Sequence, residues 1–311
     1  MNIVVTGGHG FIGSHLCRYL TAKGANVYNI DSLTYACDYV NITRVPTVET
    51  LRFDIVTDQI KLDKWFKCHP RFDAIIHLAA ETHVDNSIHR PCTFASTNVV
   101  GTCTMLNIAK RYYIPKYVQV STDEVYGSLE EGEAPWDESR LLEPNSPYSA
   151  SKASGDLLAL SYYKTFGMDI RITRCCNNFG IGQHIEKLIP KSIMSAKKYD
   201  YIDIYGNGRN EREWIHAEDH ARGIYKVLQY GQQGEIYNIG TGETFSNNEI
   251  ANMIIERVNP KASISYIKDR PGHDKKYQVD YSKIEKIGFR PRRSIKDEKE
   301  WDEMVRYYEK Y

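Results

Sequence analysis

The chain has no excess of charge of either sign and no long apolar run. Its 311 residues include 40 lysines and arginines against 40 aspartates and glutamates, so no overall field attracts nucleic acid or an anionic membrane. No apolar run approaches the roughly 18 residues that a membrane-spanning helix needs. Asn2 leads directly into Ile3, which leaves no room for the charged start of a cleavable signal. These absences predict a soluble, cytoplasmic protein without nucleic acid or membrane partners.

The seven cysteines lack the pattern of a metal site or a disulfide framework. Their number is odd, they are scattered from Cys17 to Cys176, and no two have the CxxC spacing. Free thiols in a reducing compartment are therefore expected. His216 and His220 have the spacing of a zinc-binding pair, but the glutamate between them is misplaced for an HExxH motif and no third ligand is evident. The sequence predicts no metal site.

Short apolar runs alternate with helical patterns over the first half of the chain. Such alternation is typical of βαβ units around a parallel sheet. The expected class is α/β, with residues 1–176 and part of 213–240 forming a Rossmann-type doubly wound parallel sheet. Residues 177–311 are expected to form mainly a smaller C-terminal α/β domain, ending in an amphipathic helix over 296–310. The expected strands are 3–5, 26–30, 51–53, 74–78, 117–120 and 170–173, and the expected helices are 11–22, 62–67, 93–112 and 148–166.

A glycine-rich turn follows the first expected strand and opens the first helix. Gly7 permits the tight turn, Gly10 lets the backbone approach a pyrophosphate, and Gly13 allows the helix to pack closely on the strand. The helix N-terminus then offers free N–H groups to the anion. Asp31 ends the second expected strand, where a carboxylate can bind ribose hydroxyls and repel a 2′-phosphate; Ser32 beside it offers no cation. The turn and the acid together predict NAD as the cofactor.

A tyrosine and a lysine stand one turn apart at the start of an expected helix. Ser146 and Pro147 suit the N-cap and the first helical position, which places Tyr148 and Lys152 one above the other. A phenol acts as a base near neutral pH only when its pKa is lowered. The Lys152 ammonium and a positively charged nicotinamide would favour the phenolate. The pair therefore predicts oxidation of a carbinol.

Two adjacent carboxyl groups follow the fifth expected strand. Asp123 and Glu124 are neighbours, and two close carboxyl groups resist simultaneous ionisation, so that one can stay protonated as an acid while the other acts as a base. Next to a redox pair, they indicate a lyase that uses its nicotinamide internally.

The chain resembles the extended short-chain dehydrogenase/reductase superfamily and, within it, the nucleotide-sugar 4,6-dehydratases of the dTDP-glucose type. The resemblance covers nearly the whole chain and rests on the segments TGGHGFIG, HLAAETHVDNS, STDEVYG, YSASK, NNFG, EKLIPK, REWIHAEDHA, YNIG and DRPGHDKKY. The pair Asp123 and Glu124 discriminates within the superfamily, because similar sugar epimerases usually carry serine or another residue in place of the aspartate.

The resemblance implies a mechanism and a set of roles. Tyr148, assisted by Lys152 and Thr122, would take the proton of the C4 hydroxyl while the C4 hydride moves to NAD. Glu124 would then remove the C5 proton as Asp123 protonates the departing C6 hydroxyl, and the hydride would return to C6 with retention at C5. With the positions that the resemblance adds, the expected cofactor residues are Gly7, Gly10, Phe11, Ile12, Gly13, Asp31, Ser32, Thr34, Asp54, Ile55, Leu78, Ala79, Ala80, Thr82, Thr97, Tyr148, Lys152 and Asn178.

The resemblance also implies a nucleotide-diphosphate sugar as substrate and a second copy of the chain as partner. The expected dimer is joined by a four-helix bundle of helices 93–112 and 148–166, although packing within one chain would explain the same apolar positions. dTDP-glucose, UDP-glucose and UDP-N-acetylglucosamine all remain open as substrates. A nucleotide-sugar 4-epimerase and a non-catalytic NAD-binding regulator are the rival functions. The expected substrate residues are His83, Thr122, Asn177, Glu186, Lys187, Arg212, Asn247, Arg270 and His273.

Overall fold

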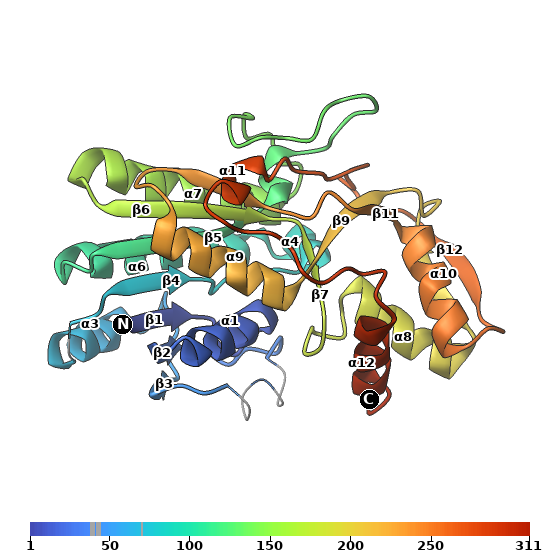
Figure 1. Cartoon of the computed structure of the whole chain (residues 1–311), viewed down its shortest axis with the longest axis horizontal. Coiled ribbons are helices and arrows are strands. Elements are labelled where there is room, and N and C mark those ends of the chain that lie inside the picture. Colours follow the sequence, from blue (N-terminus) through green and yellow to red (C-terminus); the bar gives the residue numbers. More distant parts are fainter. Residues whose placement is uncertain (38–40, 42–44, 70) are drawn as a thin grey trace.

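A seven-stranded, all-parallel sheet is the central layer of the protein (Figure 1). The computed structural model describes residues 1–37, 41, 45–69 and 71–311. Strand order is β10-β6-β5-β4-β1-β2-β3, so the chain order reverses between β1 and β4. Such a switch point opens a crevice at the carboxyl ends of the strands. The strands are β1 (Asn2–Thr6), β2 (Asn26–Ile30), β3 (Glu49–Leu51), β4 (Ala74–His77), β5 (Lys116–Thr122), β6 (Asp169–Cys175) and β10 (Ile236–Ile239).

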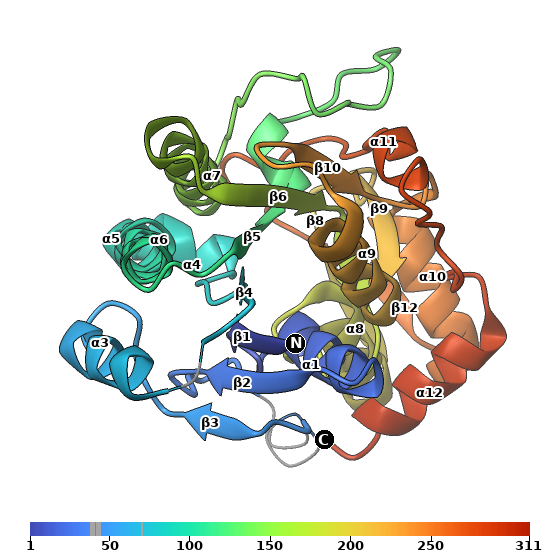
Figure 2. The same cartoon turned by 60° about the vertical axis from the view of Figure 1, so that its left-hand side comes forward.

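Helices cover both faces of the sheet (Figure 2). One face carries α1 (Phe11–Ala22) and α9 (Ala217–Tyr230), and the other carries α3 (Gln59–Cys68), α6 (Thr102–Arg111) and α7 (Pro147–Phe166). Successive side chains of a strand point to opposite faces. Ile3 and Val5 accordingly join the core beneath α1 and α9, while Val4 joins the core on the other face. The expected doubly wound Rossmann-type sheet is confirmed.

The remaining elements form a smaller layer beside the carboxyl edge of the sheet (Figure 1). This layer has a hydrophobic core of its own. Trp301 and Met304 of the last helix belong to this core, so the apolar face of that helix is buried. Its strands are β7 (Asn177–Phe179), β9 (Glu211–His216) and β11 (Thr244–Ser246) in one sheet, and β8 (Tyr201–Tyr205) and β12 (Ser263–Ile267) in another. Its helices are α8 (Leu188–Tyr199), α10 (Asn247–Val258) and α12 (Glu298–Tyr308), whereas α11 (Ser282–Glu285) packs with β10 and α9 in a core of the main sheet.

Two expected elements differ from what the structure shows. The strand expected over 51–53 lies at Glu49–Leu51, because the backbone there pairs with Tyr28 to Ile30 of β2. The helix expected over 93–112 is divided into α5 (Pro91–Ala95), a π-helical turn η1 (Ser96–Gly101) and α6. Within η1, Asn98 donates to the Glu81 carbonyl and to Ser151 Oγ. The wide turn thus joins the loop after β4 to α7. Among the described residues, none of the helices is both long and apolar enough to cross a bilayer.

A histidine buried at the end of β4 is expected to make stability depend on pH. The His77 ring is 1% exposed and lies between the hydroxyls of Thr6 and Thr102. Burial, and then the charge of Lys152, lower its pKa from 6.5 to about 3. Below pH 6.5 the unfolded chain binds a proton that the folded protein excludes, so this contribution to stability is lost as pH falls through this window.

His77→Asn should therefore lower stability most near neutral pH. The difference in unfolding free energy between the two proteins should shrink by about 1.4 kcal/mol for each pH unit below the pKa of the unfolded chain. Urea unfolding at a series of pH values measures this difference. A difference that stays constant across the window would mean that the folded protein protonates the ring.

Candidate active site

A cavity of about 370 Å³ lies at the carboxyl ends of the parallel strands, next to the switch point between β1 and β4. Every residue that the sequence analysis assigned to the cofactor lines it. Contact of these residues with a cofactor stays a prediction, but the fold brings all of them together.

The glycine turn after β1 has room for a backbone and for no side chain. Gly7 has φ of +73°, and a Cβ there would lie 2.9 Å from the Ala79 backbone nitrogen. A Cβ on Gly13 would lie 2.0 Å from the Gly7 carbonyl oxygen. Gly10 caps α1 without a side-chain hydrogen bond, so the first-turn N–H groups stay directed at the cavity. This cradle fits a pyrophosphate.

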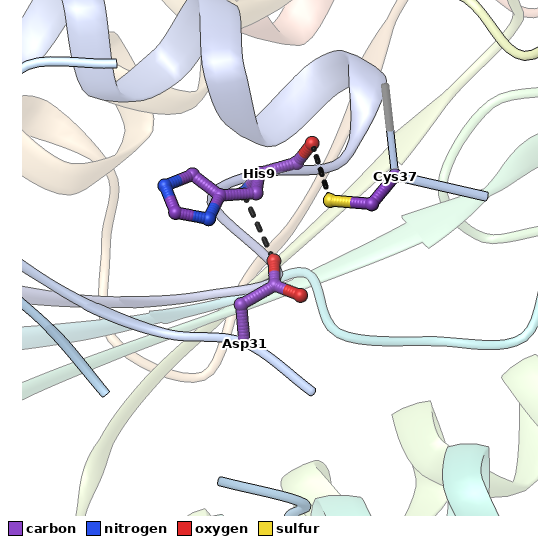
Figure 3. Close-up of side chains that lie close together, drawn as sticks. All are labelled: His9, Asp31 and Cys37. Atoms are coloured by element: carbon purple, nitrogen blue, oxygen red, sulfur yellow. Dashed lines mark hydrogen bonds between the residues drawn. The ribbon is translucent and has the colours of Figure 1, made fainter. Parts of the chain in front are cut away.

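Asp31 is held in a fixed orientation beside this turn (Figure 3). One carboxylate oxygen accepts from the His9 backbone N–H at 2.9 Å and the other from the Leu33 N–H at 2.8 Å. The Cys37 thiol donates to the His9 carbonyl. His9, Asp31 and Cys37 offer potential metal-ligand atoms within 4.8 Å of one another, a grouping that the sequence analysis did not predict. Asp31 and Cys37 also line the cavity, whereas His9 lies outside its lining.

Helix α7 presents the tyrosine and the lysine from its first turns. A capping box between Ser146 and Ser149 fixes the start of the helix, with Pro147 at its first position. Tyr148 and Lys152 are both less than 10% exposed and line the cavity. Lys152 Nζ donates to the Val120 carbonyl at 2.7 Å. The predicted start of this helix is thus found in the structure.

The protein's own groups do not lower the pKa of Tyr148. Burial, and then the charge of Glu124, raise the pKa of the phenol well above its usual value, and a hydrogen bond with Thr122 only partly offsets this. Burial also lowers the pKa of Lys152. The expectation was that Lys152 and a positively charged nicotinamide together lower the pKa of Tyr148, and it stays a prediction.

The acid pair lies in a short 3₁₀ helix, η2 (Asp123–Tyr126), directly after β5. Thr122 accepts from the Glu124 N–H and donates to Asp123 Oδ1 at 3.2 Å. Burial, then the charges of Glu124 and Glu213, raise the pKa of Asp123 well above its usual value. Burial also raises the pKa of Glu124, whereas the charge of Arg270 opposes the rise. Both pKa values are thus raised, and that of Asp123, which is only 1% exposed, is raised more strongly.

The expected substrate residues divide into two groups. Thr122, Asn177, Glu186 and Lys187 line the cavity, and Lys187 Nζ donates to the Thr82 carbonyl at 2.8 Å. Outside its lining lie His83, Arg212, Asn247, Arg270 and His273, as does the expected catalytic residue Asp123.

Three of the residues outside the cavity lining, Arg212, Arg270 and His273, bind to other groups of the same chain. The Arg212 guanidinium donates to the carbonyls of Glu211 and Asp274 and stacks over the ring of Tyr277 at 4.2 Å. Arg212 is 5% exposed, and its donors are directed at this backbone.

Arg270 and His273 are bonded to carboxylates, although burial lowers the pKa of His273 to about 4. Arg270 approaches Asp85 at 3.5 Å, and His273 pairs with Asp269 at 2.7 Å. The predicted contact of this group with a diphosphate remains a prediction.

Sequence reasoning missed several residues of the cavity wall. Cys175 and Cys176 stand where β6 ends, and Ser121 near the end of β5, so strand position alone was a usable signal for these three. Of the others, Ile30 ends β2, Val120 lies on β5, Leu188 begins α8 and Trp214 lies on β9, and the rest reach the cavity from loops. The missed residues are Ile30, Ala36, Cys37, Phe53, Glu81, Val120, Ser121, Cys175, Cys176, Gln183, His184, Leu188 and Trp214.

Comparisons with known proteins agree with this geometry. The family model described as GDP-mannose 4,6 dehydratase matches residues 4–300. A dTDP-glucose 4,6-dehydratase of Streptomyces griseus is 44% identical over 95% of this chain and 91% of its own. A crystal structure of DesIV, a dTDP-glucose 4,6-dehydratase from Streptomyces venezuelae with NAD and TYD bound, superimposes with a TM-score of 0.92 at 44% identity, covering 100% of this chain and 97% of that one. A UDP-glucose 4-epimerase of Thermotoga maritima reaches a TM-score of 0.91 at 27% identity, covering 100% and 99%. The overall fold therefore does not separate the two reactions.

Proposed function

Because the chain belongs to the GDP-mannose 4,6-dehydratase family and is an NAD-dependent nucleotide-sugar 4,6-dehydratase, we propose that its substrate is dTDP-glucose and its product the corresponding 4-keto-6-deoxy sugar nucleotide. The observation that carries the reaction is the pair of buried Asp123 and partly buried Glu124 beside Tyr148. The names of the relatives favour dTDP-glucose over UDP-glucose and UDP-N-acetylglucosamine.

In this proposal the residues have the roles that the family resemblance implies, and the positions of the side chains support them. Tyr148, with Thr122 and Lys152, takes the proton of the C4 hydroxyl. Glu124, in the cavity wall, takes the C5 proton, and Asp123, which holds its own proton most strongly, gives it to the departing C6 hydroxyl. NAD supplies a hydride acceptor for C4 and a hydride donor for C6, and a positive charge near the phenol.

The cofactor and the sugar nucleotide are bound mainly by different parts of the chain. In this proposal residues 1–176 with part of 213–240 hold NAD, and residues 177–311 mainly hold the sugar nucleotide. The cavity is lined from both parts, by the glycine turn on one side and by Asn177, Glu186 and Lys187 on the other. An epimerase would use the same redox pair but has no step for Asp123.

Incubation of the purified protein with each of the three sugar nucleotides tests the proposal. Mass spectrometry should show loss of one water from dTDP-glucose, together with the alkaline absorbance of a 4-keto sugar. Loss of water only from a UDP sugar would replace the substrate. An unchanged mass with a converted hexose would replace dehydration by epimerisation, and no conversion with retained NAD binding would favour the regulator.

A homodimer through α6, α7 and their copies is the expected assembly. These helices lie side by side on one face of the sheet (Figure 2). The surface of this layer leaves Val100, Leu157 and Phe166 exposed at 46%, 59% and 47%. Large apolar side chains that stay exposed are typical of a subunit interface.

Leu157→Glu should convert the dimer into a monomer, because the new carboxylate would be buried without a partner in the bundle. Size-exclusion chromatography with light scattering measures the mass. Leu141→Glu is the matched control, since Leu141 is 75% exposed in the loop before α7. A Leu157→Glu protein that keeps the mass of a dimer would place the interface elsewhere.

A further inference from the structure

A buried ion pair lies directly behind the reacting residues. Asp156 follows Lys152 by one helical turn on α7, as Lys152 follows Tyr148, so the three side chains share one face of the helix. Asp156 Oδ2 accepts from Arg174 Nε at 2.9 Å, and the two side chains are 0% and 2% exposed. Arg174 in turn stacks over Tyr126, which donates to Asn238 on β10.

The ion pair between Asp156 and Arg174 is formed by one of the two carboxylate oxygens of Asp156. Asp156 Oδ1 has no hydrogen-bond partner in the described part of the chain. A buried ion pair is weak evidence for a purely stabilising role, because desolvation offsets much of the attraction. A charge retained at this depth, one turn from Lys152, therefore calls for another explanation.

We propose that Asp156 is a positioning residue for the reaction: fixed by Arg174, its carboxylate keeps Lys152 an ammonium beside Tyr148. This inference rests on the proposed redox roles of Tyr148 and Lys152. Burial favours the neutral amine of Lys152. The hydrogen bond from Lys152 Nζ goes to the uncharged Val120 carbonyl.

The charged and titratable groups around Lys152 come from every neighbouring element. Burial lowers the pKa of Lys152; Asp156 opposes this most strongly, followed by the Cys175 thiol. His77 on β4 also senses the charge of Lys152 and stays neutral. The groups that interact electrostatically with Lys152 are Asp156 on α7, Cys175 on β6 and His77 on β4, and Arg174 on β6 pairs with Asp156.

The double variant Asp156→Asn with Arg174→Gln is the main test, because neither charge is then left buried alone. In this protein Lys152 should lose its proton about one pH unit earlier. The alkaline limb of the pH profile of kcat should move to lower pH by the same amount. Asp156→Asn alone should shift the limb in the same direction, and Asp156→Glu, which keeps the charge, should return it toward the wild-type position.

A purely structural role gives a different result. It would lower kcat or the unfolding temperature equally at all pH values and leave the alkaline limb where it is, and this outcome would overturn the proposal.

A direct measurement of the Lys152 titration keeps the test independent of the substrate. Lysines labelled with an isotope at Cε are titrated by NMR, with Lys152 assigned by the signal lost in Lys152→Met. If the wild type dehydrates no sugar nucleotide, the proposed function fails, whereas an unchanged titration of Lys152 in the double variant refutes the role of Asp156.

Discussion

Asp123→Asn should lower turnover by about 100- to 10,000-fold, the usual contribution of a positioned acid. The Asp123 carboxyl group is 1% exposed and accepts a hydrogen bond from the Thr122 hydroxyl, and its pKa lies well above the usual value. Burial and the charge of Glu124 thus favour the protonated form of Asp123, as the role of an acid requires. Asparagine has nearly the same shape and keeps the hydrogen bond, but it cannot protonate a departing hydroxyl.

The readout separates the redox step from elimination. With Asp123→Asn, Tyr148 still accepts the C4 proton, so the absorbance of reduced nicotinamide should rise on addition of substrate while no water is lost. Asp302→Asn is the control, because this side chain is 66% exposed on α12. A variant at Asp123 that converts its substrate at nearly the wild-type rate would identify an epimerase.

Gly13→Ala should weaken NAD binding by at least about tenfold, since overpacking costs on the order of 1–3 kcal/mol and 1.4 kcal/mol is tenfold in affinity. The added Cβ would lie 2.0 Å from the Gly7 carbonyl oxygen and 2.8 Å from the Gly8 Cα. These are backbone atoms of the phosphate turn, so the turn itself must open.

Two measurements report the loss of NAD affinity: the NAD content of the purified protein and a titration with NAD. Gly132→Ala adds the same methyl group in a distant turn, where nothing lies within 4 Å of the new atom. Its strained φ of +83° should cost some stability and leave NAD binding unchanged. If Gly13→Ala binds NAD like the wild type, the pyrophosphate does not lie on this turn.

The sequence predicted the sheet and its cofactor cavity well, because both depend on local patterns. Parallel strands buried on both faces appear as apolar runs, and their carboxyl ends mark one edge. The order of residues along the chain therefore sufficed to assign Asp31, Asp123 and Lys152 to the same edge.

What the sequence could not predict depends on partners distant along the chain. The donors of Arg212 are taken by the carbonyl of Asp274, which lies 62 residues away. The π-helical turn at 96–101 forms where Asn98 reaches Glu81 and Ser151. The pKa of Tyr148 depends on burial and on Glu124, neither of which the spacing of tyrosine and lysine reveals.

The position of β10 at the edge of the main sheet has a consequence for synthesis of the chain. By residue 176, six of the seven strands have been made, but β10 and the helix α9 have not. Helix α9 supplies Ile224 and Leu228 to the core that contains Leu16 and Leu20. During translation, α1 is therefore alone on this face of the nascent sheet until residues 177–230 have also left the ribosome. The dinucleotide half is first in the gene, yet it is completed only after much of the other half has been made.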